Sequence, residues 1–220
     1  MKYFAIIVAG GKGLRMGKNL PKQFIPVKGT PVLMHTIRKF HSAVPDISII
    51  IVLPKDHQQY WKDLCSEYNF DIPHTIADGG ETRYHSVKNG LLHTNTSDAV
   101  IAIHDGVRPF VSEEVICNSF NIAEKQGTAV PVIELVDSIR HKEGDGTTQS
   151  VSRDEYVLVQ TPQVFRADII HAAYAQSFSP LFTDDASVAE ANNITITTIP
   201  GNRENVKITT PFDLKIAEIL

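Results

Sequence analysis

Short apolar runs alternate along the chain with longer stretches in which apolar residues recur near helical spacing. The short runs, several of them rich in β-branched residues, predict strands. They cover residues 3–9, 47–53, 75–77, 99–103, 128–132 and 194–199. The periodic stretches predict helices. They cover residues 31–40, 56–68, 86–92, 113–127, 167–176, 185–191 and 211–219. Repeated strand–helix–strand units imply an α/β fold with a mainly parallel sheet and helices on both faces.

Two of the predicted helices carry recognisable start signals. Ser112 precedes Glu113 and Glu114, and an oxygen cap with early acids suits the positive end of a helix dipole. Asp56 is the expected cap of the second helix. In an open α/β sheet, ligands bind outside the carboxyl ends of the strands, so the loops at those ends are candidate functional loops.

Residues 133–160 break the alternation. Two extended runs, 133–141 and 150–159, flank a Gly/Asp-rich turn at 142–148, which is a hairpin signal. The segment is too polar for a central strand pair. We therefore predict a β-hairpin arm that projects from a single domain spanning residues 1–220.

Composition narrows the function classes. The 220 residues are 42% hydrophobic and 21% charged, which is ordinary for a globular domain. A net charge of −4 gives no broad basic face for a nucleic-acid partner. Two widely spaced cysteines, no leader-like N-terminus and no long apolar run predict a cytoplasmic protein without a membrane segment.

A glycine-rich stretch follows the first predicted strand. Gly10, Gly11 and Gly13 can turn backbone N–H groups toward one anion, and Arg15 and Lys22 add full positive charge. The spacing is neither that of a Walker loop nor that of a dinucleotide fingerprint. We interpret the stretch as a triphosphate cradle, against the alternative of a plain strand–helix turn.

Asp105 closes the buried run 99–103, at the expected carboxyl edge of the sheet. A carboxylate that faces a triphosphate is best explained by Mg²⁺, which takes oxygen ligands from one or two carboxylates plus phosphates. The alternative is a structural ion pair between Asp105 and Arg108. His104 is expected to be a packed strand-end histidine.

Two further stretches, 79–86 and 183–185, carry candidate site residues. Gly79 and Gly80 would let backbone approach a planar base and Ser86 could bond its edge, although a plain capped loop fits equally well. Arg83 is either a phosphate ligand or a solvated side chain. Residues 183–185 are either a helix cap or a second carboxylate site, and capping is favoured. We find no acyl-transfer triad and no zinc spacing.

Taken together, these motifs resemble the 2-C-methyl-D-erythritol 4-phosphate cytidylyltransferases of the non-mevalonate isoprenoid pathway, from residue 3 to the C-terminus. The matching segments are 9–17, 21–23, 79–86, 104–109, 161–163, 183–187 and 205–209. Ribitol-5-phosphate and ribulose-5-phosphate cytidylyltransferases share most of them. Glu81 stands where the family often has aspartate, Ser138 where it has threonine, and Gly106-Val107 replaces two alanines.

The resemblance implies a Rossmann-like nucleotidyltransferase fold, CTP as cosubstrate, Mg²⁺, and a homodimer joined through the 133–160 arm. Arg15 and Lys22 would be the catalytic cations. Nucleotide contacts would come from Ala9, Gly10, Gly11, Gly13, Gly79, Gly80, Glu81, Ser86, Asp105 and Gly106, with Asp105 also on the metal. Acceptor contacts would come from Arg108, Ser138, Arg153, Thr161, Thr183 and Lys207, with Arg153 reaching in from the other subunit.

The implied reaction is attack by a phosphate oxygen of the sugar-alcohol phosphate on the α-phosphorus of CTP, which releases pyrophosphate. The nucleophile is already an anion at pH 7, so no general base is required. Two alternatives stay open: the same fold acting on ribitol 5-phosphate or a sugar 1-phosphate, and a non-catalytic nucleotide-binding domain.

Overall fold

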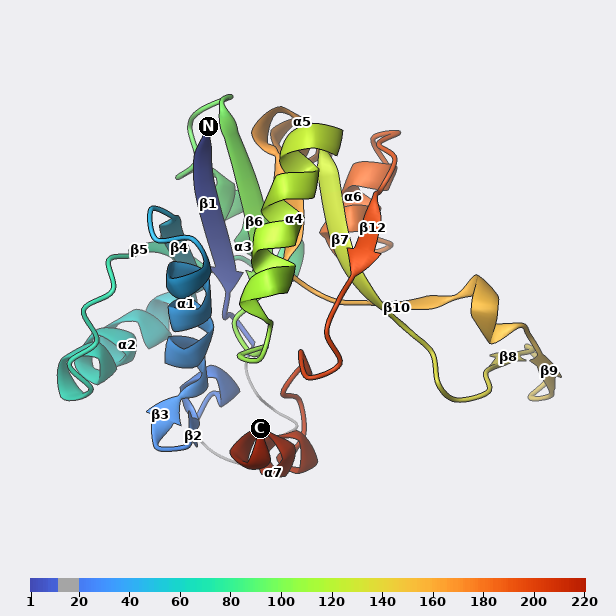
Figure 1. Cartoon of the computed structure of the whole chain (residues 1–220), viewed down its shortest axis with the longest axis horizontal. Coiled ribbons are helices and arrows are strands. Elements are labelled where there is room, and N and C mark those ends of the chain that lie inside the picture. Colours follow the sequence, from blue (N-terminus) through green and yellow to red (C-terminus); the bar gives the residue numbers. More distant parts are fainter. Residues whose placement is uncertain (12–19) are drawn as a thin grey trace.

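An eight-stranded mixed sheet forms the centre of the computed structural model, which describes residues 1–11 and 20–220 (Figure 1). Its strands are β1 (Lys2–Val8), β4 (Ser48–Leu53), β5 (Thr75–Asp78), β6 (Ala99–Asp105), β7 (Thr128–Glu134), β10 (Val157–Val159), β11 (Gln163–Arg166) and β12 (Thr198–Pro200). Their order across the sheet is β10-β7-β11-β6-β1-β4-β5, and β12 pairs with β7.

The centre of the sheet is parallel, as predicted. β1 pairs in parallel with both β4 and β6, and the register sets Val8 beside Val52 on one side and Asp105 on the other. β11 is antiparallel to both β6 and β7, and β10 is antiparallel to β7. The carboxyl ends of β1 and β6 therefore lie side by side, which brings Ala9 and the following glycines next to Asp105.

Helices cover both faces of the sheet, in agreement with the predicted fold class. One face packs against α1 (Val32–Ala43), α2 (Lys55–Glu67) and α4 (Glu113–Gln126). The other packs against α3 (Arg83–Leu91), α5 (Ala167–Ala173) and α6 (Asp185–Glu190). Near the carboxyl edge, α7 (Pro211–Ile219) packs close to β2 (Pro26–Val27) and β3 (Thr30–Pro31), which follow the 3-10 turn η2 (Lys22–Phe24) (Figure 1).

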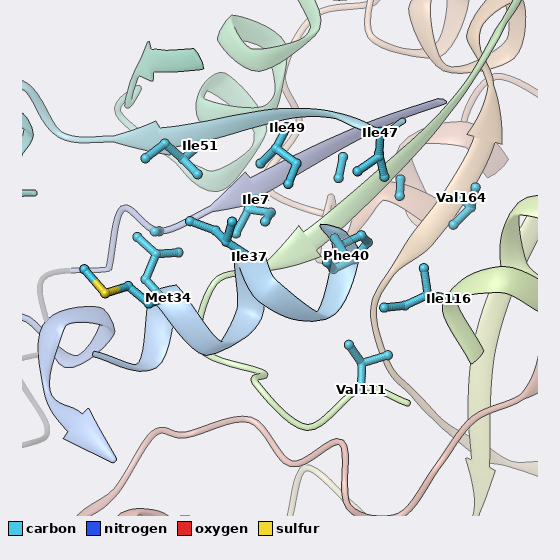
Figure 2. Packing of buried hydrophobic residues seen from close by; sticks show 14 of the residues in the cluster. Ile7, Met34, Ile37, Phe40, Ile47, Ile49, Ile51, Val111, Ile116 and Val164 are labelled. Carbon is cyan, nitrogen blue, oxygen red and sulfur yellow. The ribbon is translucent and has the colours of Figure 1, made fainter. Parts of the chain in front are cut away.

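The core on the first face is one continuous cluster of aliphatic and aromatic side chains. Figure 2 shows Ile37 and Phe40 of α1 beside Ile7 of β1, with Ile49 and Ile51 of β4 following along the same layer. These five side chains are almost fully buried. Each buried aliphatic or aromatic side chain contributes about 1.5–3 kcal/mol relative to exposure, so this layer holds the strand ends that carry the site in place.

Two helix starts follow from local chemistry. Ser112 caps α4 as predicted, because its Oγ accepts the Val115 N–H at 3.2 Å. The predicted cap at Asp56 is wrong: α2 begins at Lys55 after Pro54, and Asp56 lies in its first turn. The helix predicted from residue 86 begins at Arg83, because the Thr82 side chain accepts the His85 N–H and extends the helix by one turn.

The strand predicted over 194–199 is much shorter in the structure. Only Thr198–Pro200 forms β12. The preceding residues still follow β7, but through single contacts: Thr128 Oγ1 donates to Thr195 O at 3.2 Å, and Val130 N to Thr197 O at 2.9 Å. The β-branched run therefore lies beside the sheet without forming a full ladder.

The predicted hairpin is confirmed as an arm that extends away from the body (Figure 1). β8 (Arg140–Lys142) pairs antiparallel with β9 (Thr148–Ser150), and the short turn η3 (Arg153–Glu155) follows. The two ends of the arm are built into the central sheet as β7 and β10. In the described part of the chain, no helix combines the length and apolar character that crossing a membrane requires.

Candidate active site

A cavity of about 250 Å³ opens at the carboxyl ends of β1 and β6. Its walls come from the segment after β1, the turn η2, the loop before α3, the end of β6 and the segment before α7. It is lined by Val8, Ala9, Gly10, Gly11, Lys22, Gln23, Gly80, Glu81, Thr82, Arg83, Ser86, Asp105, Val107 and Lys207.

Most of the predicted nucleotide-side residues meet in this cavity. The predicted residues that line it are Ala9, Gly10, Gly11, Lys22, Gly80, Glu81, Ser86, Asp105 and Lys207. Gly79 and Gly106 directly adjoin lining residues in the chain. Gly13 and Arg15 lie outside the described residues.

Asp105 is surrounded by positive charge. Its Oδ2 lies 2.8 Å from Lys207 Nζ and 3.5 Å from Arg108 Nε, and its Oδ1 lies 3.5 Å from Arg83 Nε. Burial alone would raise the pKa of this carboxyl, but Arg83, Lys207 and Arg108 together hold the pKa well below its usual range. The predicted pair with Arg108 exists, and it is one of three contacts to cations.

Arg83 is tied down from its other side. Its Nη1 and Nη2 donate to the two carboxylate oxygens of Asp185 at 2.9 and 2.6 Å. The Asp185 side chain is completely buried and also accepts the Tyr174 hydroxyl at 2.6 Å. Burial opposes ionisation of Arg83, but the Asp185 charge outweighs it and raises the Arg83 pKa. Arg83 is therefore held between two carboxylates at the cavity wall, with 28% of its side chain exposed.

A buried hydrogen-bond chain supports Asp105 from behind. The Asp105 N–H donates to Thr161 Oγ1 at 3.2 Å, and the Thr161 hydroxyl lies 3.0 Å from His104 Nδ1. His104 Nε2 lies 3.0 Å from the Arg108 carbonyl, which can only accept, so His104 is the neutral Nε2–H tautomer. Burial lowers the pKa of His104 to about 4, which agrees with this neutral form. His104 is the packed histidine that the sequence predicts.

Two predicted acceptor residues take part in this support. The Thr161 hydroxyl is buried and occupied by the Asp105 N–H and His104. Arg108 Nη1 donates to the Asn205 carbonyl at 2.7 Å, which ties the end of β6 to the segment that carries Lys207. Neither Thr161 nor Arg108 lines the cavity. In this structure, both bind the segments that carry the lining residues Asp105 and Lys207.

The loop before α3 is shaped by glycine and Ser86. Ser86 Oγ accepts the Gly80 N–H at 3.0 Å and donates to Thr82 O at 3.0 Å. A Cβ on Gly80 would lie 2.4 Å from His85 Cβ, and one on Gly79 would lie 3.1 Å from Pro54 N. These glycines are required by close packing, and Ser86 fixes the loop that they form.

Gly106 allows the loop after β6 to approach the loop after β1. Its N–H donates to Val8 O at 2.9 Å, and a Cβ there would lie 3.0 Å from Ala9 Cβ. Thr36 of α1 donates its hydroxyl to Gly106 O at 3.1 Å. The close approach keeps the backbone of Ala9–Gly11 beside Asp105.

Three predicted acceptor residues lie away from the cavity in this chain. Ser138 and Arg153 are exposed on the arm, where Arg153 Nη1 donates to Val136 O. Thr183 is exposed before α6, and its N–H donates to Ser187 Oγ at 3.1 Å. Asp184 caps α6 with its side chain on the Ser187 N–H at 2.9 Å, so the predicted capping role of this segment is confirmed.

Comparison with known proteins now adds to this geometry. The model of the 2-C-methyl-D-erythritol 4-phosphate cytidylyltransferase family matches residues 3–220. The chain belongs to this family. It is 57% identical over 216 residues to the cytidylyltransferase of that name from Bacteroides fragilis, with 98% of each chain covered. It is 54% identical over 220 residues to the one from Bacteroides thetaiotaomicron, with 100% of each covered.

Solved structures give the same relationship. The crystal structure of 4-diphosphocytidyl-2C-methyl-D-erythritol synthase from Anaerococcus prevotii superposes with a TM-score of 0.84 at 31% identity, covering 99% of this chain and 95% of that one. The cytidylyltransferase from Thermus thermophilus superposes with a TM-score of 0.76 at 27% identity, covering 100% and 98%. The resemblance to the cytidylyltransferase family and the nucleotidyltransferase fold are thus confirmed.

Two residues that shape the cavity have no binding or catalytic role in the sequence-based prediction: Gln23 lines it, and Asp185 lies behind Arg83, outside it. Gln23 is fully buried and its Nε2 donates to Ala9 O at 2.7 Å, which anchors the start of the glycine stretch. Asp185, the partner of Arg83, appears in the sequence only within a possible cap or carboxylate site. Its position directly after a capping residue gives no signal of a charge partner 102 positions away.

The donor set fits a metal only together with phosphate oxygens. Among residues 1–11 and 20–220, no three His, Cys, Asp or Glu side chains gather as metal ligands. Asp105 is the buried carboxylate of the cavity, and Glu81 is exposed at its wall. One carboxylate plus substrate phosphates is a usual protein environment for Mg²⁺. Asp105 therefore fits a shared metal site and does not form a complete one.

Proposed function

We propose that this cavity is the site at which the chain transfers CMP from CTP to 2-C-methyl-D-erythritol 4-phosphate. The products are 4-CDP-2-C-methyl-D-erythritol, an isoprenoid precursor, and pyrophosphate. The observation that carries the assignment is the meeting of Gly10–Gly11, Lys22 and the Asp105–Lys207 pair in one cavity, in a member of the cytidylyltransferase family.

The nucleotide side is formed by the segment after β1 and the loop before α3. Ala9, Gly10 and Gly11 offer backbone to the triphosphate, and Lys22 of η2 adds charge beside Gly11. Gly79, Gly80, Glu81 and Ser86 form the base side. Gly13 and Arg15, predicted as a further phosphate donor and a catalytic cation, belong to the same stretch of sequence.

The reaction needs positioning and positive charge more than proton transfer. The attacking phosphate monoester is an anion at pH 7, since its second pKa is about 6. Lys22 and Lys207 counter the charge of two polyanions and of the leaving pyrophosphate, which is the main requirement of phosphoryl and nucleotidyl transfer. The neutral, buried His104 holds Asp105 through Thr161 and takes no proton from the substrate.

Mg²⁺ belongs to the same proposal. Asp105 would hold it jointly with phosphate oxygens of CTP, and the ion would supply charge neutralisation at the triphosphate. The 2.8 Å contact with Lys207 keeps Asp105 ionised and oriented. Binding of the ion and the nucleotide would require Lys207 to share or give up this oxygen, which frees its ammonium group for the acceptor phosphate.

The acceptor side involves the arm and a second copy of the chain. Lys207, Thr183 and Arg108 would contact the acceptor from one subunit, and Ser138 and Arg153 from the partner's arm. The exposed apolar side chains of Tyr156, Val157, Leu158 and Val159 support a homodimer through residues 133–160. Thr161 would support the acceptor site from behind.

The remaining features of the proposal concern the whole chain. Residues 1–220 would form one cytidylyltransferase domain, since one eight-stranded sheet combines strands from β1 near the N-terminus to β12 near the C-terminus. Free thiols at Cys65 and Cys117 suit a reducing cytoplasm. The partners are small phosphorylated molecules and a second copy of the chain, without a nucleic acid or membrane partner.

Pyrophosphate release tests the reaction. Purified protein with Mg²⁺ is incubated with CTP, UTP or ATP and with methylerythritol 4-phosphate, ribitol 5-phosphate, ribulose 5-phosphate or a sugar 1-phosphate. We expect release only with CTP and methylerythritol 4-phosphate. Faster pyrophosphate release with ribitol 5-phosphate would identify that compound as the acceptor instead. Binding of CTP without pyrophosphate release in the presence of any acceptor would contradict the proposal that the protein is an enzyme.

A further inference from the structure

The ion pair between Arg83 and Asp185 joins helix α3, whose first turn lines the cavity, to the start of α6, which lies outside the cavity beside the predicted acceptor residue Thr183. Arg83 is the first residue of α3, and Ser86, three positions later, lines the cavity on the base side. Asp185 is the first residue of α6, directly after Thr183 and Asp184 on the acceptor side. The pair therefore crosses from one half of the proposed site to the other.

The geometry of the pair leaves Arg83 little freedom. Nη1 and Nη2 lie 2.9 and 2.6 Å from the two Asp185 oxygens, which is the bidentate arrangement that fixes a guanidinium plane. Nε lies 3.5 Å from Asp105 Oδ1. Arg83 is thus a bridge between a fully buried carboxylate and the carboxylate at the centre of the cavity.

Asp185 is itself held in one orientation. The Tyr174 hydroxyl donates to Oδ1 at 2.6 Å, and the Tyr174 ring stacks on Tyr84 at 4.8 Å between centroids. Tyr84 is the residue after Arg83 in α3. The aromatic pair therefore links helix α3 at Tyr84 to the Asp185 carboxylate through the Tyr174 hydroxyl.

We propose that Asp185 is a positioning residue for nucleotidyl transfer. It acts through Arg83, whose guanidinium it holds beside Asp105, and it thereby fixes the acceptor-side segment 183–185 relative to helix α3 on the nucleotide side. The inference rests on the proposed function of the cavity. Without the Asp185 carboxylate, Arg83 is free to move onto Asp105 and compete with Lys207 for it.

A double-mutant cycle tests this role. The variants are Asp185→Asn, Arg83→Gln and the double variant, assayed for pyrophosphate release and for thermal unfolding. We expect Asp185→Asn to lower kcat by about 10²-fold, because a displaced charged group near the reacting atoms can cost that much. In the Arg83→Gln background the same substitution should have no further effect on kcat, since Asp185 acts through Arg83.

Stability separates positioning from a merely structural role. Arg83→Gln leaves the Asp185 charge buried and unpaired, so its Tm should fall, and the double variant should recover part of the loss. If the pair only supports the fold, kcat recovers together with Tm. If Asp185 positions Arg83, Tm recovers and kcat does not.

Two further variants complete the design. Asp185→Glu keeps the charge but shifts the carboxylate by one methylene group, so it should fold and still lose at least about tenfold in kcat. Asp168→Asn is the matched control, because Asp168 forms a similar bidentate pair with Arg166, at 3.1 and 2.7 Å, on the exterior. Its kcat should equal that of the wild type.

The inference is wrong if folded Asp185→Asn or Asp185→Glu keeps wild-type kcat. It is also wrong if the double variant loses activity by the product of the two single losses. Failure of the proposed function gives a different result, because the wild-type protein would then release no pyrophosphate from CTP and methylerythritol 4-phosphate.

Discussion

Asp105 is the residue at which the charges of the cavity meet. Its position follows from the β1–β6 register, and its ionised state follows from the cations around it. The sequence predicts Asp105 because it closes a buried run at the carboxyl edge of the sheet, and it predicts Lys207 through the resemblance of segment 205–209 to the cytidylyltransferases. Their contact at 2.8 Å depends on long-range packing that no local pattern contains.

Loss of the Lys207 ammonium group should impair turnover more than folding. The side chain is 42% exposed, so Lys207→Ala leaves no cavity in the core. We expect kcat for pyrophosphate release to fall by about 10²–10³-fold, the usual effect of removing one charge-stabilising contact. Lys22→Ala should behave alike. Lys215→Ala, on the exposed side of α7, is the control, and near-normal turnover of Lys207→Ala would contradict the assignment.

Gly80 should tolerate no side chain. In Gly80→Ala the new Cβ would meet His85 Cβ at 2.4 Å and Ser86 N at 2.9 Å, so the loop has to shift. We expect a loss of about 1–3 kcal/mol in the free energy of unfolding, and a raised KM for CTP. Gly144→Ala provides the comparison, because nothing lies within 4 Å of its Cβ position. Equal effects in the two variants would show that the Gly80 loop adapts.

His104 should make stability depend on pH. Its pKa is lowered to about 4 by burial, whereas an unfolded histidine has a pKa of about 6.5. Between these values the unfolded chain binds more protons, so stability falls as pH falls from 6.5 to 4, by about 3 kcal/mol from this residue. Urea unfolding at pH 7 and pH 5 should show about 2 kcal/mol of this loss. His104→Gln should reduce it and His141→Gln, on the arm, should not.

At the scale of elements, the hydrophobic periodicity of the sequence predicts the helices and strands whose formation depends on local sequence. The buried runs of β1, β4 and β6 and the capped helix α4 are all in the predicted places. β11 is not predicted, because a strand of four residues is too short to show an alternation of apolar and polar positions. Its place between β6 and β7 is set by antiparallel pairing with strands that are distant in the sequence. The Arg83–Asp185 pair is not predicted either, because its two residues are 102 positions apart and no local pattern links them.

The start of α4 offers a test of how local chemistry contributes to this fold. Ser112→Ala removes the oxygen that accepts the Val115 N–H at 3.2 Å, so we expect a loss of about 1 kcal/mol in the free energy of unfolding. Ser112→Asp keeps an acceptor and should retain most of the stability. Both variants should keep wild-type kcat, since α4 lies outside the cavity, and a lower kcat in Ser112→Asp would contradict that separation.

At the scale of the whole molecule, the arm extends away from the body and adds none of the described lining residues to the cavity of its own chain. Its strands β8 and β9 are exposed, and Ser138 and Arg153 lie on it away from the cavity of their own chain. A dimer that exchanges arms would bring these residues to the acceptor side of the partner's site. The turn signal predicts the arm from the sequence, and the proposed second copy of the chain would account for its position.

Subunit mixing tests the exchanged arm. Arg153→Ala and Lys22→Ala should each be inactive, for different reasons. If Arg153 serves the partner's site, a mixed dimer contains one site with both residues intact, so mixing should restore a measurable part of the activity. Subunit exchange is verified with two different affinity tags. Exchange without any recovery would contradict the shared site.

The link between the arm and the sheet has a mechanical consequence. Only residues 160–162 separate β10 from β11, and buried bonds hold them: Gln160 N to Pro131 O at 2.8 Å, and Asn205 Nδ2 to Thr161 O at 2.7 Å. Thr161 in this link also accepts the Asp105 N–H. The arm is therefore joined to the sheet through a short, buried and hydrogen-bonded link, and that link is bonded directly to the backbone of Asp105, the residue at the centre of the cavity.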